Sequence, residues 1–268
     1  MIPKIIHYVW IGPNPKPAAV LRCIESWRRF CPEYEIREWG NKDLSYIKND
    51  YVEQALKCKK WAFVSDYIRL YALNKYGGIY CDTDLELTAN LDCFLNNDFF
   101  MGYEMDRKYP SYSTALIGSK ANHPIINDLL QEYKNRPFLI NGIPDLTPNP
   151  VRFDRYFKEK FGISVPKNVD KMQIIKPNSY IYPSYFFCLP KPNCKNYAIH
   201  HFQASWCDAF RPRIKAKIHL GSKIFYLIKV HHKRGHGVLK LPQNIHILFL
   251  GNKNKKSFWI LGYERVSQ

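Results

Sequence analysis

The chain lacks any hydrophobic run long enough to cross a membrane, and it lacks a Cys-x-x-Cys pair. A membrane-spanning helix needs roughly 18 or more consecutive apolar residues, and no stretch of the 268 residues reaches that length. The first apolar segment begins almost at the N-terminus, so we find no signal peptide before it. We therefore expect a cytoplasmic protein. Its eight cysteines are expected to be reduced core residues rather than disulfides or a zinc site.

Acidic residues are also scarce, with 23 Asp and Glu against 40 Lys and Arg and a formal net charge of +17. The imbalance is concentrated at the C-terminal end, where residues 211–268 contain 13 basic side chains and a single acid, Glu264. A strongly basic chain can bind nucleic acid. Here the basic residues are not interleaved with an aromatic motif, so we expect no nucleic-acid partner and rank that function low.

The hydrophobic content of 46% is enough for a packed core. Apolar segments of strand and helix period alternate along the chain, which predicts an α/β sheet with ligands at the carboxyl ends of its strands. A loop rich in Pro and Asn, residues 141–150, is expected over or near the site. We expect strands at residues 5–11, 34–39, 99–103, 114–117, 172–175, 180–187 and 197–202, and helices at 18–30, 61–73 and 124–136.

The most informative segment is residues 76–84, with the sequence YGGIYCDTD. It places Asp82 and Asp84 one residue apart at the end of a short apolar run. In a strand, alternate side chains point to the same face, so the two carboxylates are expected on one side. Two carboxylates so placed can hold a hard divalent cation, which in turn can neutralise a diphosphate.

A helix carrying Asp66 and Arg69 precedes this segment. Its apolar residues recur at helical spacing, and Gly77 with Gly78 ends it. Because Asp66 and Arg69 are three residues apart, they share a helix face. Taken alone, they could be a solvated ion pair of little energetic value. The apolar neighbourhood and the paired aspartates favour a functional pair instead.

This order of motifs resembles the sugar-nucleotide region of the family-32 glycosyltransferases, which include bacterial capsular-polysaccharide transferases. The same block is similar to one in the large clostridial glucosylating toxins. Residues 2–12, with the sequence IPKIIHYVWIG, look like the family's opening strand, and residues 198–206, AIHHFQASW, resemble its closing motif. The resemblance implies a GT-A-like, Rossmann-like mixed sheet flanked by helices over residues 1–210, followed by a basic appendage at 211–268.

The resemblance indicates which residues bind the cation and which residue contacts the base of the donor. It implies that Asp84 ligates Mn²⁺ or Mg²⁺ directly, with Asp82 near the ribose and the metal. Such a metal would act as a Lewis acid on the leaving nucleoside diphosphate. It also implies that the Trp10 indole stacks on the donor base beside the Val9 backbone. The alternative for Trp10 is a core tryptophan.

The remaining assignments concern the sugar and the diphosphate. Asp66 and Arg69 are expected to bind the sugar hydroxyls, and Tyr80 either lines the donor pocket or packs in the core. His200, in preference to His201, is expected as a metal ligand. The resemblance also suggests that Ser205 reaches the metal and that the Trp206 indole donates to the diphosphate. The toxins carry an acid before this Ser-Trp pair and the present chain does not, so the last metal ligand stays open.

We expect a retaining, metal-dependent transferase that moves a hexose from a nucleotide sugar, UDP-hexose in particular. The expected acceptor is a surface-polysaccharide precursor or lipid-linked glycan. A protein-modifying, toxin-like transferase is the main alternative. The sequence does not identify a nucleophile, although Glu104, which follows an expected strand, is one candidate carboxylate near the sugar.

The basic C-terminal segment suggests where the enzyme works. Residues 211–241 combine nine basic side chains with an apolar stripe, a composition that can lie in a membrane interface and be attracted to anionic lipid. We therefore expect a peripheral protein on the inner face of a bacterial cell membrane. The alternative is a C-terminal helix packed on the domain with a solvated basic face.

Overall fold

The computed structural model describes residues 1–105, 110–166 and 169–202 with their side chains. Beyond these it describes the backbone of four further strands, β12 to β15. The chain divides into two compact units, Met1–His201 and Phe202–Gln268. The candidate site residues that the structure describes lie in the first unit.

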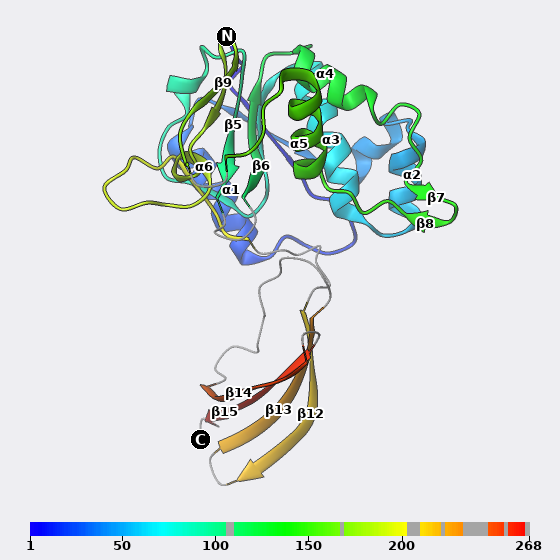
Figure 1. Ribbon diagram of the computed structural model, residues 1–268, viewed down its shortest axis with the longest axis vertical. Helices are drawn as coiled ribbons and strands as arrows, with labels where there is room; N and C mark the ends of the chain where they lie inside the picture. Colours follow the sequence, from blue (N-terminus) through cyan, green and yellow to red (C-terminus); the bar gives the residue numbers. More distant parts are fainter. Residues whose placement is uncertain are drawn as a thin grey trace. The chain divides into compact units, whose positions relative to one another are not determined.

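The first unit is built on a seven-stranded mixed sheet with the order β2-β1-β3-β6-β5-β10-β9 (Figure 1). Strand β1 runs parallel to β2 and β3, and β10 runs parallel to β5. Strand β6 is antiparallel to both β3 and β5, and β9 is antiparallel to β10. The strands are β1 (Ile5–Val9), β2 (Glu35–Trp39), β3 (Gly78–Cys81), β5 (Phe99–Glu104), β6 (Ser111–Ser119), β9 (Gln173–Lys176) and β10 (Ser179–Tyr182).

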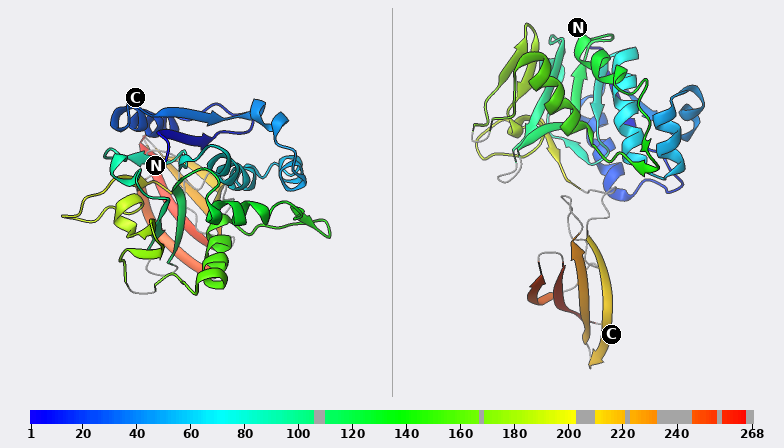
Figure 2. Two further views of the ribbon diagram at one scale, coloured as in Figure 1. Left: turned by 90° about the horizontal axis from the view of Figure 1, so that it is seen from above. Right: turned by 45° about the vertical axis from the view of Figure 1, so that its right-hand side comes forward.

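Helices cover both faces of this sheet (Figures 1 and 2). Because side chains alternate along a strand, Ile79 packs in a core that includes helix α1, whereas Tyr80 packs in the core formed with helices α3, α4 and α5. The expected α/β class with a helix-flanked mixed sheet is thereby confirmed. The helices are α1 (Ala18–Phe30), α2 (Asp50–Lys57), α3 (Trp61–Tyr76), α4 (Pro124–Gln131), α5 (Asn149–Phe161) and α6 (Ser184–Phe187), with 3-10 turns η1 (Asn41–Tyr46) and η2 (Asp92–Phe94).

Two small antiparallel pairs complete the unit. Strand β4 (Leu85–Leu87) pairs with β11 (Ala198–His200), and β7 (Leu139–Ile140) forms a hairpin with β8 (Ile143–Pro144). The pairing of β4 with β11 matters for the site, because it brings the segment after the two aspartates beside the late strand that ends in His200.

The turn between α3 and β3 requires glycine at both positions. Gly77 and Gly78 have φ angles of +66° and +99°, which side-chain-bearing residues rarely adopt. A Cβ on Gly77 would lie 2.7 Å from the Ala121 nitrogen, and one on Gly78 would lie 2.7 Å from the Ile5 oxygen. This turn therefore fixes how the helix with Asp66 and Arg69 approaches the strand that leads to Asp82.

Several sequence-based expectations were wrong. Residues 184–187 form helix α6 rather than the second half of a strand, and the expected surface loop at 141–150 contains β8 and the first turn of α5. The cysteines within the described residues are free, but they are not all in the core, because Cys93 is exposed.

The second unit contains one four-stranded antiparallel sheet with the order β12-β13-β15-β14 (Figure 2). Its strands are β12 (Phe210–Leu220), β13 (Lys223–His232), β14 (His246–Asn254) and β15 (Ser257–Arg265). Where the structure describes the backbone of the basic segment, it forms strands, so the helix that we considered for residues 211–220 and 223–232 is wrong. Within the part of the chain that the structure describes, no helix combines the length and apolar character needed to cross a bilayer.

Candidate functional site

Asp82 and Asp84 lie in a tight turn just beyond strand β3. The strand ends at Cys81. The Asp82 amide donates to the Ala115 oxygen at 2.8 Å, and the Leu85 amide donates to the Asp82 oxygen at 2.9 Å. A hydrogen bond from residue i+3 back to residue i marks a β-turn. The two carboxylates therefore converge because the chain turns, and strand alternation, from which we expected it, is not the cause.

His200, which lies near the C-terminal end of the first unit in the sequence, contacts this turn. Strand β11 pairs with β4 so that His200 lies opposite Leu85, and its Nε2 is 3.3 Å from Oδ1 of Asp84. One donor atom from each of Asp82, Asp84 and His200 falls within 4.8 Å of the others. The neighbouring His201 instead contacts Glu86 at 2.8 Å.

The chemistry of this cluster suits a divalent cation. Burial lowers the pKa of His200, but the hydrogen bond to Asp84 and the charge of that carboxylate outweigh it, so the pKa lies above the ordinary 6.5. The cluster thus attracts positive charge. Two carboxylates and one imidazole fit Mn²⁺ or Mg²⁺, both of which favour oxygen-rich ligand sets.

Arg69 links the aspartate turn to helix α3. Its Nη2 lies 3.1 Å from Oδ1 of Asp66 and 3.3 Å from Oδ1 of Asp82, and its Nη1 donates to the Thr114 oxygen at 2.6 Å. Asp66 and Arg69 are 7% and 5% exposed. The alternative of a solvated surface pair is therefore wrong. Removing either member of such a buried pair strongly destabilises the folded protein, because the other charge is left buried without its partner.

Tyr80 packs against the Arg69 guanidinium and is 2% exposed. The Arg69 guanidinium carbon sits 4.5 Å from the centre of the Tyr80 ring, a cation–π distance. The Tyr80 hydroxyl donates to Oδ1 of Asp82 at 2.9 Å. Asp82 is thus oriented from two sides, while its own side chain stays 26% exposed.

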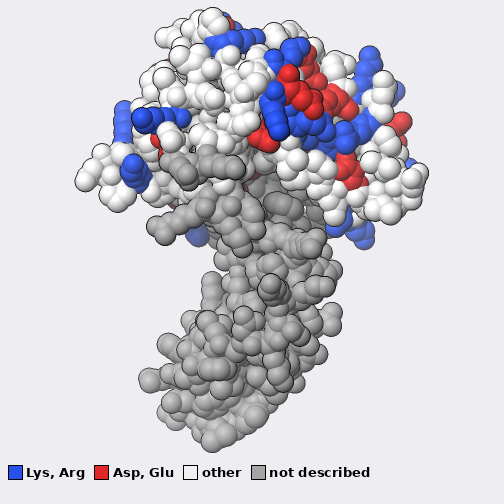
Figure 3. All heavy atoms as spheres, viewed as in Figure 1, with Lys and Arg blue, Asp and Glu red and all other residues white. Residues whose placement is uncertain are grey.

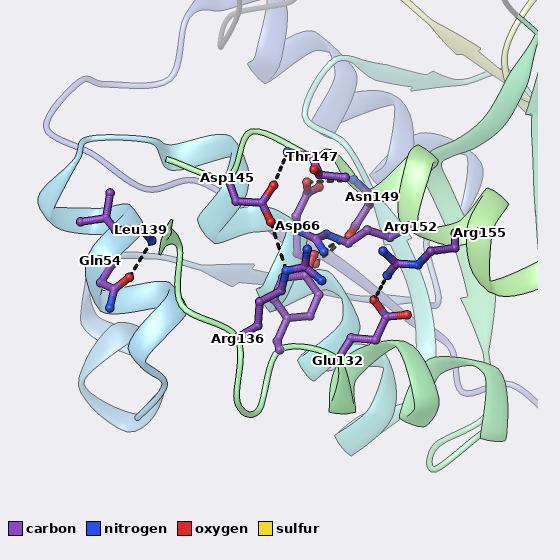
Figure 4. Close-up of polar contacts among 11 residues, drawn as sticks. Gln54, Asp66, Glu132, Arg136, Leu139, Asp145, Thr147, Asn149, Arg152 and Arg155 are labelled. Carbon is purple, nitrogen blue, oxygen red and sulfur yellow. Dashed lines mark hydrogen bonds and ion pairs between the residues drawn. The ribbon is translucent and has the colours of Figure 1, made fainter. Parts of the chain in front are cut away.

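Asp66 is held from its other side by Asn149, a residue that sequence reasoning missed (Figure 4). The Asn149 backbone N–H donates to Oδ2 of Asp66 at 3.1 Å, and the Asn149 side chain donates from Nδ2 to the Asp66 backbone oxygen at 2.9 Å. The Tyr133 hydroxyl donates to Oδ1 of Asn149 at 2.7 Å. The signal in the sequence was the Pro-Asn-Pro triplet at 148–150, which we expected in a loop over or near the site. Its place near the site is confirmed, whereas its contact with Asp66 was missed.

The segment before Asn149 is itself tied to the domain (Figure 4). Asp145 accepts from Arg136 Nε at 3.1 Å and from Arg152 Nη2 at 3.0 Å, and the Thr147 amide donates to it at 3.1 Å. Thr147 hydrogen bonds and the Arg152 charge outweigh the effect of burial and lower the pKa of Asp145 to about 2. This anchored segment fixes Asn149 against Asp66.

Burial raises the pKa of Asp66 to about 6, although the Arg69 charge and the Asn149 amide oppose the shift. A carboxyl group with that pKa, beside a second aspartate that contacts the same arginine, is typical of a functional site.

The expected base-binding residues lie at the end of β1. Val9 is buried, whereas Trp10 is half-buried and donates from its indole to the Asn14 oxygen at 2.9 Å. The following Gly12 exchanges two 3.0 Å hydrogen bonds with the Asn41 side chain, which holds this loop in place. Ser205 and Trp206 lie outside the described residues.

Charged side chains elsewhere on this unit are mixed in sign. Figure 3 shows Lys and Arg interleaved with Asp and Glu on the face that carries α4 and α5. There Arg155 pairs with Glu132, and Lys160 lies 3.5 Å from Asp128. The visible face of the first unit is therefore no uniform basic stripe.

Residues 17–101 match the family described as glycosyltransferase sugar-binding region containing DXD motif. The matched segment contains Asp66, Arg69, Asp82 and Asp84. The Asp82-Thr83-Asp84 sequence has the DXD pattern that this description names.

Three curated proteins are similar to parts of this chain. A glycosyltransferase of Acanthamoeba polyphaga mimivirus is 32% identical over 134 residues, 47% of this chain and 53% of the relative. Inositol phosphoceramide mannosyltransferase 3 of Schizosaccharomyces pombe is 30% identical over 141 residues, 51% and 37% of the two chains. Toxin A of Clostridium novyi is 34% identical over 76 residues, 28% of this chain and 3% of the toxin.

The chain spans about half the length, or less, of the curated relatives it matches. Among solved structures, the PaToxG glycosyltransferase is similar to 60% of this chain and 70% of its own, with 19% identity and a TM-score of 0.45.

Proposed function

We propose that this chain is a metal-dependent, retaining glycosyltransferase of the GT-A type that transfers a hexose from a nucleotide sugar, UDP-hexose in particular. The observation that carries the proposal is the convergence of Asp82, Asp84 and His200, with donor atoms within 4.8 Å, on the DXD turn of the matched sugar-binding region. These three residues would hold Mn²⁺ or Mg²⁺. A cation there would act as a Lewis acid toward the leaving diphosphate.

The residues of the chain divide the other tasks. Trp10 stacks on the base beside Val9, and Asp82 reaches the ribose. Asp66 and Arg69 bind hydroxyls of the transferred hexose, since a carboxylate and a guanidinium offer complementary acceptors and donors. Because both side chains are nearly buried, a hexose hydroxyl would reach them only at their small exposed surfaces. Ser205 and Trp206 would complete the contacts to the metal and the diphosphate.

Arg69 also sets the geometry of the site. Its guanidinium contacts both Asp66 and Asp82, so the carboxylate assigned to the hexose and the one assigned to the ribose and the metal are held relative to each other before any substrate arrives. Such preorganisation reduces the reorganisation that the reaction itself requires.

The acceptor that we propose is a lipid-linked or surface-polysaccharide glycan at the inner face of a bacterial membrane. One similar protein is named a mannosyltransferase of inositol phosphoceramide, which supports a lipid-linked acceptor. The basic residues after position 210 supply the charge that anionic lipid attracts. In this proposal residues 1–210 form the catalytic domain and 211–268 the membrane-associating segment.

The test begins with a thermal-shift screen of nucleotide sugars in the presence of Mn²⁺. A donor that binds only the folded state raises Tm by mass action, so a hit names the base and the sugar. The stabilising donor is then incubated with lipid-linked glycans and with protein acceptors, and NMR of the product reads the anomeric configuration. Transfer with retention to a lipid-linked glycan is the expected result. If no nucleotide sugar stabilises the chain, the proposal is refuted. If sugar is transferred to protein alone, the acceptor is a protein rather than a lipid-linked glycan.

A further inference from the structure

His200 belongs to a second cluster of metal-binding side chains. Besides its place with Asp82 and Asp84, one of its ring nitrogens lies within 4.8 Å of a Glu104 oxygen and of the Cys188 sulfur, and these two atoms also lie within 4.8 Å of each other. Glu104 and His200 are partly exposed, and Cys188 is buried. A carboxylate oxygen, a thiol sulfur and an imidazole nitrogen therefore lie near one another beside the DXD turn.

The fold places these side chains there from three separate elements. Glu104 is the last residue of β5, Cys188 follows the C-terminus of α6, and His200 ends β11. The His200 amide donates to the Cys188 oxygen at 3.0 Å, which fixes the backbones of two of the three residues relative to each other. The cluster is thus part of the packed unit.

The donor set differs in kind from the DXD cluster. Hard cations such as Mn²⁺ and Mg²⁺ favour carboxylate oxygens, whereas a thiolate with an imidazole selects softer ions, Zn²⁺ above all. Tetrahedral zinc, with bonds of about 2.0–2.3 Å, places its ligand atoms roughly 3.3–3.8 Å apart. Because the three atoms lie within 4.8 Å of one another, a contraction of at most about 1.5 Å would bring them to that spacing, and water would supply the fourth ligand.

We propose that Glu104, Cys188 and His200 form a second cation site, selective for Zn²⁺. On binding, the Cys188 S–H bond breaks, its proton leaves to solvent, and the sulfur forms a bond to the metal. Because the site takes His200 as a ligand, its occupation removes His200 from the set with Asp82 and Asp84. Zinc at this site therefore inhibits the Mn²⁺-dependent reaction, and this consequence rests on the proposed function.

Cobalt reports on the site without any activity measurement. Co²⁺ occupies zinc sites, and a cobalt–thiolate bond gives a charge-transfer absorption in the near ultraviolet. We expect this band in the wild-type chain, its loss on addition of Zn²⁺, and its absence in Cys188→Ser. The matched control Cys23→Ser, which changes another buried cysteine, keeps the band. Absence of a band in the wild type, or a band that survives in Cys188→Ser, overturns the site.

Two further variants separate this site from the DXD cluster. Glu104→Gln keeps the shape of the side chain and should weaken Zn²⁺ binding at least about tenfold, since even supporting residues of metal sites contribute that much. Asp84→Asn should keep the cobalt band, because Asp84 is not a ligand of the second site. If Asp84→Asn abolishes the band and Glu104→Gln does not, the assignment of ligands is wrong.

The inhibitory consequence is tested by zinc titration of the Mn²⁺-dependent transfer reaction. The zinc concentration for half-inhibition should rise at least about tenfold in Cys188→Ser relative to wild type and to Cys23→Ser. Equal inhibition of all three would show that zinc acts elsewhere and would refute the competition for His200. If the chain binds cobalt through Cys188 but transfers no sugar, the proposed function is wrong and the zinc-site proposal stands.

Discussion

The imidazole Nε2 of His200 lies 3.3 Å from Oδ1 of Asp84, although the two residues belong to separate motifs of the sequence. The antiparallel pairing of β4 with β11 produces this proximity. The same pairing directs the adjacent His201 to Glu86. The chain therefore offers two neighbouring histidines of which one faces the proposed metal.

Replacing His200 by Ala should weaken Mn²⁺ binding at least about tenfold, because the cation loses its only described nitrogen ligand in the DXD cluster. Isothermal titration of Mn²⁺ measures the effect. His201→Ala is the matched control and should bind Mn²⁺ as wild type does. Weakening in His201→Ala alone would reverse the assignment of the two histidines.

Replacing Asn149 by Ala should slow transfer more than it weakens donor binding. The variant loses the hydrogen bond to the Asp66 backbone and leaves the Tyr133 hydroxyl unpaired, a loss of about 1–3 kcal/mol. If that loss acts on the position of Asp66, it corresponds to roughly a 5- to 150-fold fall in kcat. Tyr133→Phe, which removes only the hydroxyl, should have a smaller effect. A lower Tm with unchanged kcat would mean that Asn149 has a purely structural role.

The stability contributed by Asp66 should depend on pH. Its pKa rises on folding from an ordinary 3.8 to about 6, so the folded state binds the proton more tightly than the unfolded state. The free energy of unfolding of the wild type, relative to Asp66→Asn, should therefore fall by about 2 kcal/mol as pH rises from about 4 to about 6. Chemical denaturation of both proteins at several pH values measures this difference.

Asp145 provides the control for that experiment. Its pKa is lowered on folding to about 2, so its contribution is complete above its ordinary pKa near 3.8 and is lost only at lower pH. The stability difference between wild type and Asp145→Asn should stay constant from about pH 4 to about pH 6. A constant difference for Asp66→Asn over that range would contradict its raised pKa.

Replacing Trp10 by Ala should weaken nucleotide binding by about 1–3 kcal/mol, the usual value of a stacked base, with less effect on saturated turnover. Donor titration of the folded variant is the measurement. Trp10→Phe keeps an aromatic face and should recover part of the affinity. Unchanged affinity in Trp10→Ala would make this residue a packing residue.

Membrane association should depend on the segment after residue 210. Full-length protein is expected to sediment with anionic vesicles at low salt, because basic residues near a charged surface each contribute about 1 kcal/mol. A chain ending at Phe210 should stay in the supernatant, as should the full chain with neutral vesicles. If full-length protein also stays in the supernatant, the membrane proposal is wrong and the transferase proposal is unaffected.

Local patterns predicted the elements around the site well. Helix α1 has the expected bounds, and the apolar spacing of residues 61–73 correctly indicated the helix with Asp66 and Arg69. These segments have a clear helical period, and a glycine pair ends the second one. The pattern also indicated that both charged residues share a face, but their burial depends on Thr114 and Asp82, which come from other elements.

The features that were missed depend on tertiary contacts or on a different period. The convergence of Asp82 and Asp84 depends on a turn, and Asn149 reaches Asp66 only because Asp145 and its two arginines anchor the segment before it. In the basic segment, Arg211, Arg213, Lys215 and Lys217 alternate with other residues at the period of a strand. We considered a packed helix as the alternative for this segment, whereas the backbone at Phe210–Leu220 forms β12.

Whether the DXD turn binds the donor through a metal can be measured by donor titration with and without Mn²⁺ in the wild type and in Asp84→Ala. Titration of the nucleotide sugar identified by thermal shift should show tight binding only to the wild-type chain and only with the cation present. Asp98→Ala, which alters an aspartate paired with Lys120 away from the site, is the control and should bind as wild type does. Equal donor binding without metal, or by a folded Asp84→Ala variant, would contradict the account.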